Sequence, residues 1–501
     1  MKTVRLIGAT VFVVTVFAGC GGPSQEPVPT PAPTEPAVVA GEPEQAQPAA
    51  AVDEATPAAP VPITAPARKI EIYPANRYYW QYDGKPVLLL GGSVEDNLFQ
   101  IPDVAKHLDL LQSVGGNYVR CTMSSRDEGN VWAFAREGDK YDLNKFNDEY
   151  WDRFASFLKA ANERNVIVQV EVWATFDFYR EPWAANPFNP KNNVNYTAEQ
   201  SGLPEEVTTH PTRTENNFFW SVPAENNQQT VLQYQRRFVD KLLSISLDYG
   251  NVLYCMDNET SVTPEWGKYW AEYIKGKAAE AGVTVQTTEM WDNWDIGHPQ
   301  HSNTFDHPEV YSFVDISQNN HLSGQQHWDN AQKQRARIAD AARPLNNVKI
   351  YGADTGKYGT DRDGIERFWR NIFGGLASAR FHRPTSGLGL NEKAQANIKS
   401  LRMLTDRMDI FTCDPNNNLL SQREENEAYC IAKPGAEYAV FFPDGGYVVL
   451  DTSALQKDAK VVWLQISSSE WKDKTAIELK ASEKQLILRC PKGDYWAVLV
   501  K

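Results

Sequence analysis

The sequence has few cysteines, and none of them lies in a pattern that binds a metal. Six Cys are spread over 501 residues, with no CxxC pair and no Cys/His cluster at zinc spacing. This absence excludes the common structural zinc modules. A P-loop, a GxGxxG motif after a strand and an HExxH motif are also missing, which excludes the usual nucleotide sites and one class of metalloprotease. We therefore expect no metal and no cofactor.

Positive charge is scarce. Lys and Arg number 50 against 64 Asp and Glu, which gives a formal net charge of -14 at pH 7. Such a protein repels phosphate backbones and anionic lipid surfaces, so we expect no nucleic-acid partner. A neutral or weakly charged substrate fits better. Aromatic residues are plentiful, with 15 Trp. Their faces can serve as platforms for sugar rings, although Trp also fills the cores of large proteins.

The sequence has no apolar run long enough for an ordinary transmembrane helix. The stretch from Leu6 to Phe17 is too short to span a bilayer. Basic residues precede it, as in a secretory signal. Phe17-Ala18-Gly19-Cys20 then resembles the bacterial lipobox, in which the cysteine is lipidated and becomes the mature N-terminus. We expect an exported lipoprotein anchored to the cell envelope through Cys20, on its periplasmic or outer side. A plain secretory signal with an incidental cysteine is the alternative.

Large apolar residues are almost absent from residues 21–66, which consist mostly of Pro, Ala, Glu, Val and Thr. Such a segment cannot bury a core, and we expect a disordered, extended tether. The predicted organisation is a lipoprotein-type signal peptide at 1–20, this linker at 21–66, a catalytic domain at 67–415 and a smaller C-terminal domain at 416–501.

From residue 67 onward, apolar strand-like runs alternate with helical patterns. A hairpin with Asp83-Gly84 at its turn comes first. Eight runs follow, at 86–92, 116–123, 166–173, 251–259, 283–291, 310–317, 348–354 and 375–384, and helical patterns cover 103–115, 150–165, 234–250, 267–282 and 332–345. This alternation predicts a parallel sheet, and eight repeats predict an α/β fold of the (β/α)8 TIM-barrel type.

The last part of the chain has a different pattern. Seven short strand-like runs, at 428–435, 437–446, 447–453, 460–467, 477–482, 485–493 and 494–501, follow one another without helices. They predict a small antiparallel β-sandwich. Cys413 and Cys430 are the likeliest disulfide in an exported protein, whereas Cys121 and Cys255 lie in predicted buried strands and should be free thiols.

Polar residues gather where the predicted barrel strands end, which is where such barrels carry their active sites. They are Glu95 and Asp96 after the first strand, Arg120 in the second, Glu171 and Trp173 in the third, Asn258 and Glu259 in the fourth, Glu289 and Trp291 in the fifth, His321 after the sixth, Asp354 in the seventh and His382 in the eighth. Converging carboxylates with Trp and Asn, and no metal motif, indicate glycoside hydrolysis, which needs one acid and a second carboxylate. Lysine Schiff-base chemistry is disfavoured, because no predicted strand end presents an obvious lysine. Lys357 is the nearest exception.

Two motifs carry a family resemblance. Asn258-Glu259 resembles the Asn-Glu signature of the large clan of retaining (β/α)8 glycoside hydrolases. This resemblance implies that Glu259 is the acid/base, that Asn258 binds the sugar 2-hydroxyl, and that Asp354 takes the nucleophile position, where the clan normally has Glu. The opening DGKPVLLLGGSVEDNLFQ is similar to that of the apiosidase-like family in this clan, with GGSVEDN in place of a Gly-Asp-Thr-Ala-Trp type of stretch. The C-terminal runs resemble the domain named collagen-binding that often follows it.

Each site residue also has a simpler interpretation. Glu259 could belong to the first turn of a helix, and Asp354 could form an Asx turn, which would make Glu289 the rival nucleophile. Arg120 could clamp substrate or pair with carboxylates inside the barrel. The remaining candidates, Trp173, Trp291, His321 and His382, could bind sugar or serve the core. We also expect burial to raise the pKa of Glu259, and the carboxyl groups of Asp354 and Glu259 to lie within about 7 Å.

These residues leave two functions open. The first is a retaining glycosidase that acts on an oligo- or polysaccharide outside the cell. The alternative is a non-catalytic glycan-binding lipoprotein on the same barrel.

Overall fold

The computed structural model describes residues 68–211, 215–353 and 358–501. The predicted signal peptide, its Cys20 and the whole of the predicted tether lie outside these residues. So does Asp354, and its predicted role and its distance from Glu259 remain predictions.

The described chain opens with a three-stranded antiparallel sheet. It consists of β1 (Ile70–Ile72), β2 (Trp80–Tyr82) and β3 (Lys85–Val87). Asp83 and Gly84 both have positive φ, at 53° and 70°. Two such residues are what a tight two-residue hairpin turn requires, so the predicted turn is confirmed. The buried indole of Trp80 donates to Asn346 Oδ1 over 3.0 Å and joins the hairpin to the strand β12 (Leu345–Asn346).

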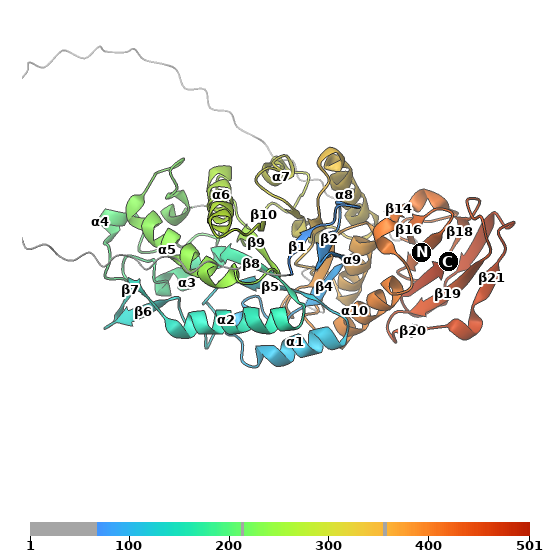
Figure 1. The fold of residues 1–501 in the computed structure, drawn as a ribbon, viewed down its shortest axis with the longest axis horizontal. Coiled ribbons are helices and arrows are strands. Elements are labelled where there is room, and N and C mark those ends of the chain that lie inside the picture. Colours follow the sequence, from blue (N-terminus) through green and yellow to red (C-terminus); the bar gives the residue numbers. More distant parts are fainter. Residues whose placement is uncertain (1–67, 212–214, 354–357) are drawn as a thin grey trace, which may run out of the picture. The chain divides into compact units, whose positions relative to one another are not determined.

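A parallel sheet of six strands forms the centre of the first domain (Figure 1). In spatial order its strands are β10 (Gln286–Thr288), β9 (Val252–Asp257), β8 (Ile167–Trp173), β5 (Tyr118–Thr122), β4 (Leu89–Gly92) and β13 (Ser378–Phe381). Every residue of β8 and β9 is buried. Burial on both faces explains why these segments read as continuous apolar runs in the sequence.

Two further strands, β11 (Val314–Asp315) and β12 (Leu345–Asn346), form a parallel pair beside this sheet. Backbone hydrogen bonds join the β12 segment to β13, from Ala377 N to Leu345 O and from Ile350 N to Arg380 O, both 2.9 Å. On the other side, the described contacts between the β10 and β11 segments use side chains, such as Ser312 Oγ accepting from Thr287 N over 3.0 Å. The arrangement is TIM-barrel-like.

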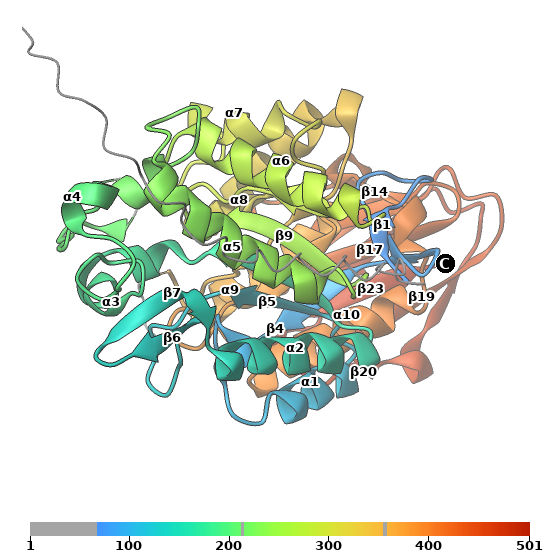
Figure 2. The same ribbon diagram turned by 60° about the vertical axis from the view of Figure 1, so that its left-hand side comes forward.

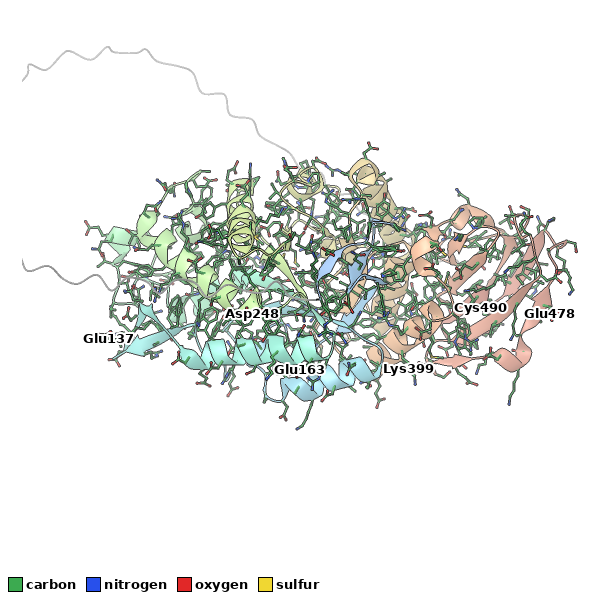
Figure 3. The ribbon with its side chains drawn as sticks, viewed as in Figure 1. Glu137, Glu163, Asp248, Lys399, Glu478 and Cys490 are labelled. Carbon is green, nitrogen blue, oxygen red and sulfur yellow. The ribbon has the colours of Figure 1, made fainter. Side chains whose placement is uncertain are left out.

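The helices lie outside the strands (Figures 1 and 2). The longer ones are α1 (Val104–Ser113), α2 (Asp148–Glu163), α5 (Gln229–Ser246), α6 (Pro264–Glu280), α8 (Gly324–Arg337), α9 (Asp361–Phe373) and α10 (Glu392–Thr405). The five predicted helices correspond to α1, α2, α5, α6 and α8. Their outer faces are polar, as Glu163 on α2 and Lys399 on α10 illustrate (Figure 3).

Shorter elements fill the connections after the second, third and fifth barrel strands. A hairpin of β6 (Phe134–Glu137) and β7 (Lys140–Phe146), and the short helices α3 (Arg180–Ala185), α4 (Ala198–Ser201) and α7 (Pro299–Phe305), were not predicted. The seventh strand also differs from the prediction. It was expected at 348–354, yet β12 covers only Leu345–Asn346. The apolar residues Val348 and Ile350 that suggested a strand are buried, but their segment pairs only with β13.

The C-terminal region is antiparallel, and each of its seven predicted runs contains a strand. One sheet has the order β14 (Asp414–Pro415), β16 (Tyr429–Lys433), β17 (Glu437–Phe442), β23 (Trp496–Val500), β19 (Ala459–Gln465) and β20 (Glu470–Trp471), with β21 (Ile477–Leu479) on β19. The other has β15 (Leu420–Ser421), β18 (Tyr447–Asp451) and β22 (Gln485–Arg489). Leu486 and Leu488 are buried whereas Ile487 is exposed, which is the alternation of a half-buried strand.

The described residues form one unit with a core that crosses from the first domain into the second. The ring of Trp369 on α9 stacks on Phe441 of β17 with centroids 5.3 Å apart and planes 15° apart. Ser400 on α10 donates to Ile466 O over 2.7 Å. The side chains of α9 and α10 therefore face the C-terminal sheet as well as the barrel strands.

The expected Cys413–Cys430 disulfide is not formed. Both are buried free thiols, as are Cys121 and Cys255, for which free thiols were predicted. The thiol of Cys413 lies 3.4 Å from Asp409 O instead. Within the described residues, no helix has the length and apolar character needed to cross a membrane.

Candidate active site

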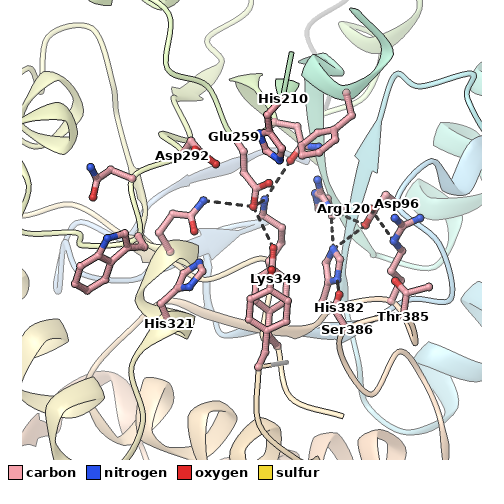
Figure 4. A pocket seen from close by; sticks show the side chains of 18 of the residues that line it. Asp96, Arg120, His210, Glu259, Asp292, His321, Lys349, His382, Thr385 and Ser386 are labelled. Carbon is pink, nitrogen blue, oxygen red and sulfur yellow. Dashed lines mark hydrogen bonds and ion pairs between the residues drawn. The ribbon is translucent and has the colours of Figure 1, made fainter. Parts of the chain in front are cut away.

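Polar side chains from most of the strand ends surround a cavity of about 650 Å³. Of the residues predicted from the sequence, Asp96, Arg120, Asn258, Glu259, His321 and His382 line it. They come from segments far apart in the sequence, and Figure 4 shows the labelled ones, such as Glu259, His321 and His382, facing a common space. The strand-end rule therefore brings these residues to one cavity, and their roles remain predictions.

Glu259 lies at the centre of this cavity, two residues beyond the end of β9. Its φ is +57°, a left-handed conformation that costs a non-glycine residue about 1–2 kcal/mol. A hydrogen bond from Thr260 N to Met290 O, 2.9 Å, anchors the next residue to the segment after β10. The backbone thus turns sharply here and directs the carboxylate of Glu259 toward the cavity.

The Oε1 atom of Glu259 accepts hydrogen bonds from three side chains. Lys349 Nζ donates to it over 2.5 Å, Tyr351 Oη over 3.0 Å and Gln318 Nε2 over 3.3 Å. Lys349 is 2% exposed and Glu259 is 14% exposed, so solvent screens this ion pair only weakly. Lys349 Nζ also donates to Asn258 Oδ1 over 3.1 Å, which links both residues of the Asn-Glu motif to one cation.

These contacts reverse the expected charge behaviour of Glu259. Burial raises its pKa, but the charge and hydrogen bond of Lys349, the charge of Arg120 and the hydroxyl of Tyr351 together lower the pKa to about 2. The prediction that burial keeps Glu259 protonated near neutral pH was wrong, because it did not include a buried lysine beside the carboxylate. In this structure Glu259 is an anion across the physiological pH range.

A second cluster lies on another side of the cavity, around Asp96. Its Oδ1 accepts from Arg120 Nη1 over 2.5 Å and lies 3.2 Å from His382 Nε2. Burial raises the pKa of Asp96, but the charge of Arg120, the hydrogen bond with His382 and the charge of Arg383 together hold it well below its usual value. Arg120 also donates from Nε to Glu171 Oε1 over 2.6 Å. Glu171 is fully buried and does not line the cavity, so it acts as a counterion of Arg120.

The histidines and Glu95 occupy supporting positions. His382 Nδ1 lies 2.6 Å from Ser386 Oγ, and burial lowers its pKa to about 4, so the ring is neutral at pH 7. His321 lines the cavity with its ring near that of Tyr358, at a centroid distance of 5.6 Å. Glu95 lies outside the cavity lining and pairs with Arg383 over 3.3 Å.

Glu289, the rival nucleophile, is buried beneath the site and does not line the cavity. Its Oε1 accepts from the backbone N–H groups of Asp257, 3.0 Å, and Met290, 2.8 Å. Burial and the neighbouring Asp257 raise its pKa. A Cβ on Gly267 of α6 would lie 2.4 Å from Glu289 Oε2, so the helix packs directly against this carboxyl group. Glu289 is therefore a structural group in this arrangement.

The two tryptophans proposed as sugar platforms belong to the core. Trp173 is 1% exposed and packs with Trp270 at a centroid distance of 5.0 Å. Trp291 is 2% exposed and donates to Thr304 Oγ1 over 2.8 Å. Neither lines the cavity, which corrects the expectation. Trp294, which is 57% exposed, lines it instead.

Several cavity residues were missed from the sequence. They are Arg126, Trp294, Gln318, Lys349, Tyr351 and Arg383. Lys349 left a usable signal, because a lone lysine between Val348 and Ile350 in an apolar run must point to a polar interior. Tyr351 lies two residues further along the same run, and Gln318 lies in the 3-10 helix η5 (Ser317–His321). Arg126, Trp294 and Arg383 lie in loops, where the sequence gives no spacing to interpret. Within the described residues, no group of three or more His, Cys, Asp or Glu side chains could hold a metal ion.

The fold resembles that of solved glycoside hydrolases. One structure, described as a glycoside hydrolase, is 11% identical with a TM-score of 0.56, covering 88% of this chain and 98% of its own. A glycoside hydrolase family 5 structure from Bacteroides vulgatus is 12% identical with a TM-score of 0.58, covering 86% and 92%. No family model and no curated protein matches the sequence. At this identity the likeness establishes a shared fold.

Proposed function

We propose that this protein is a glycoside hydrolase that cleaves O-glycosidic bonds of an oligo- or polysaccharide. The observation that carries the proposal is the placement of Glu259. It projects from the end of β9 into a cavity lined by hydrogen-bonding groups, on a fold shared with glycoside hydrolases. Glycoside hydrolysis needs a carboxylate at this kind of position, beside the anomeric carbon.

The partner carboxylate in this proposal is Asp354, with a retaining double displacement as the mechanism. The resemblance to the Asn-Glu clan supports this pairing, and Glu289 no longer competes because it does not face the cavity. A retaining pair requires carboxyl groups about 5–5.5 Å apart. The anomeric configuration of the first product, followed by NMR, tests the mechanism, and an inverted product would reject it.

The ion pair with Lys349 restricts how Glu259 can act. As an anion, Glu259 can attack the anomeric carbon or accept a proton from water. It can donate a proton to the leaving oxygen, as the family resemblance implies, only after Lys349 has moved away from it. We propose that the reaction begins with Glu259 ionised, and that any acid role follows a substrate-induced separation of this pair.

One observation favours the second candidate function, a non-catalytic glycan-binding barrel. Glu259 and Asp96 both line the cavity and both have a lowered pKa, so each is ionised near neutral pH. Sugar binding needs only hydrogen-bonding groups and an aromatic face, and the cavity offers both. Hydrolysis of an unactivated glycoside also needs a proton donor.

A hydrolysis assay separates the two functions. Purified protein is incubated with aryl glycosides and with plant and algal polysaccharides, and product is measured beside equilibrium binding. We expect Glu259→Gln to abolish hydrolysis, whereas Glu265→Gln, at an exposed position on α6, leaves it unchanged. If the wild-type protein binds glycans but hydrolyses none of the substrates in the panel, the result would favour the non-catalytic function.

The finer assignments belong to the same proposal. We propose that the eight strands close into a barrel, that the two C-terminal sheets form a sandwich of the type named collagen-binding, and that the apiosidase-like family is the nearest relative. We also propose a lipid anchor at Cys20 as the sole attachment to the membrane. Cys20→Ser should move the protein to the soluble fraction or leave its precursor uncleaved, and unchanged partitioning would favour an ordinary signal peptide.

A further inference from the structure

Arg126 is a cavity-lining cation whose hydrogen-bonding capacity is unused in the described structure. Its side chain is 14% exposed, and its guanidinium lies over the ring of Phe176, 5.6 Å from the centroid. The nearest carboxylate oxygens are Asp96 Oδ2 at 3.6 Å and Asp177 Oδ1 at 4.0 Å. Both distances exceed those of normal hydrogen bonds. Its Nη1 atom is buried with no hydrogen-bond partner among the described residues.

The carboxylates near Arg126 are already used by other groups. Asp96 binds Arg120 and His382 through Oδ1, and its Oδ2 lies 3.3 Å from Arg383 Nε. Asp177 accepts from Ser124 Oγ over 2.6 Å and from Ser125 N over 2.7 Å. Both carboxylates therefore already accept from other donors, and neither lies within hydrogen-bond distance of Arg126.

The cavity also differs in charge from the rest of the protein. Among its described lining residues are four cations, Arg120, Arg126, Lys349 and Arg383, and three carboxylates, Asp96, Glu259 and Asp292. The whole chain has a net charge of -14. Arg120, Lys349 and Arg383 each have a carboxylate oxygen within 3.3 Å, whereas Arg126 has none nearer than 3.6 Å among the described residues. An anionic group can therefore be selected at Arg126. The net charge alone suggested a neutral substrate, because it averages over the whole surface.

We propose that Arg126 binds an anionic substituent of the glycan, the carboxylate of a uronic acid or a sulfate ester. This inference rests on the proposed glycan-directed function and names its substrate class. Guanidinium groups bind carboxylate and sulfate oxygens in pairs, through two parallel hydrogen bonds. The face of Phe176 holds the guanidinium plane in place, so less conformational entropy is lost when the anion binds.

Equilibrium binding to matched glycosides tests this proposal. Titration calorimetry compares methyl glucuronoside with methyl glucoside, methyl galacturonoside with methyl galactoside, and methyl glucoside 6-sulfate with methyl glucoside. We expect at least one charged member to bind about tenfold or more tightly than its neutral partner, the usual effect of a charge-assisted pair. The uronic acid and sulfate pairs distinguish the two sources of charge. Equal binding within every pair, or no binding of any charged glycoside, would overturn the proposal.

Variants assign the effect to Arg126. Arg126→Gln should remove most of the preference for the charged glycoside, and Arg126→Lys should keep part of it, because lysine retains the charge but not the paired geometry. Arg136→Gln, at an exposed position on β6, is the matched control and should change nothing. A preference that survives Arg126→Gln would assign the anion to another group. Binding is measured without turnover, so the two proposals can fail separately. If the protein prefers charged glycosides but hydrolyses no substrate, only the hydrolase function is rejected.

Discussion

Lys349 keeps Glu259 ionised. This contact therefore decides whether Glu259 can act as a nucleophile or base, or as an acid. The ammonium group lies 2.5 Å from the carboxylate and is almost fully buried. Burial is the largest single influence on the pKa of Glu259 and raises it, but the charge and hydrogen bond of Lys349, together with Arg120 and Tyr351, outweigh it. Polar neighbours at a catalytic carboxylate thus decide its role as much as the carboxylate itself does.

We expect Lys349→Met to raise the pKa of Glu259 from about 2 to above its usual value of 4.5. The carboxyl group would then titrate between pH 4 and pH 8, where the wild-type group remains ionised. Carboxyl carbon NMR with labelled glutamate would follow the titration, with Glu259→Gln to assign the resonance. Lys268→Met, at an exposed lysine on α6, is the control. An unchanged titration would show that Lys349 does not hold the charge.

Trp294 and Trp291 are three residues apart and should respond differently to truncation. Trp294→Ala should weaken oligosaccharide binding by about tenfold, through loss of an aromatic face, without lowering the melting temperature. Trp291→Ala should lower the free energy of unfolding by about 3–5 kcal/mol, because it opens a core cavity. Calorimetric binding and denaturant unfolding would measure the two effects. Equal binding losses would contradict the assignment of Trp294 as the platform.

The position of the candidate cavity could be predicted from the sequence, but its internal contacts could not. The Asn258-Glu259 pair, Asp96 and His382 follow strands, Arg120 lies within one, and the topology of a parallel sheet brings strand ends together. Trp173 ends β8 and Trp291 follows β10, yet both are buried outside the cavity, because the sequence does not show which face of a strand lines the cavity when both faces are buried. Lys349 and Arg126 depend on side-chain contacts across different segments.

At the scale of elements, the ends of β9 and β10 are joined by a buried acid pair, Asp257 and Glu289. Glu289 accepts the N–H of Asp257, and Trp266 Nε1 donates to Asp257 Oδ2 over 2.8 Å. Burial raises the pKa of both carboxyl groups, that of Asp257 to about 8; the charge of Asp257 raises the pKa of Glu289 further, whereas the hydrogen bond with Glu289 lowers that of Asp257. The pair therefore keeps a proton near neutral pH and holds α6 against the two strands through uncharged contacts.

This pair should make the folded state less stable as pH rises. A group with a raised folded pKa contributes fully below its unfolded value, near 4, and loses that contribution as pH rises toward its folded pKa. We expect Asp257→Asn to reduce the loss of unfolding free energy between pH 6.5 and pH 8, by up to about 1.4 kcal/mol per pH unit. Urea unfolding across this range would measure the difference between variant and wild type.

The control for this experiment is Asp152→Asn, at an exposed position on α2. It should leave the pH dependence as in the wild type. The asparagine at 257 keeps an oxygen that can accept from Trp266, so the packing of α6 is preserved. Parallel curves for wild type and Asp257→Asn would show that the pair is already ionised at neutral pH.

The seventh strand shows the limit of sequence interpretation at this scale. Apolar residues at 348 and 350 indicated a strand over 348–354, but regular pairing covers only Leu345–Asn346. In a closed barrel this segment would pair with a strand on each side; its backbone bonds join it to the β13 segment, whereas toward the segment after β11 Val348 N donates to the side chain of Ser317 over 3.0 Å. The seven C-terminal runs were predicted correctly because each is short and bounded by turn residues.

At the scale of the whole molecule, the barrel-like domain and the C-terminal sheets share one apolar core. The stacked rings of Trp369 and Phe441 are both fully buried, and residues of β16, β17, β19 and β23 belong to the same cluster as the barrel helices. Such an interface is closer to the interior of a single domain than to a contact between separate ones.

We expect Phe441→Ala to lower the free energy of unfolding by about 3–5 kcal/mol, with one transition for the entire described chain. Near-ultraviolet circular dichroism and calorimetry would follow it. Ile487→Ala, at a 59% exposed position of β22, is the control and should stay within about 0.5 kcal/mol of the wild type. Two separate transitions, with the barrel signal unaffected by Phe441→Ala, would mean that the domains are energetically independent.

The stacking of Trp369 on Phe441 also limits the modularity of this architecture. If residues 416–501 were cut away or exchanged for an unrelated domain, α9 and α10 would present a bare apolar surface to water. Surfaces of that kind drive aggregation in proteins that expose them. The C-terminal region therefore completes the core of the barrel-like domain, and that domain could not be transplanted without it.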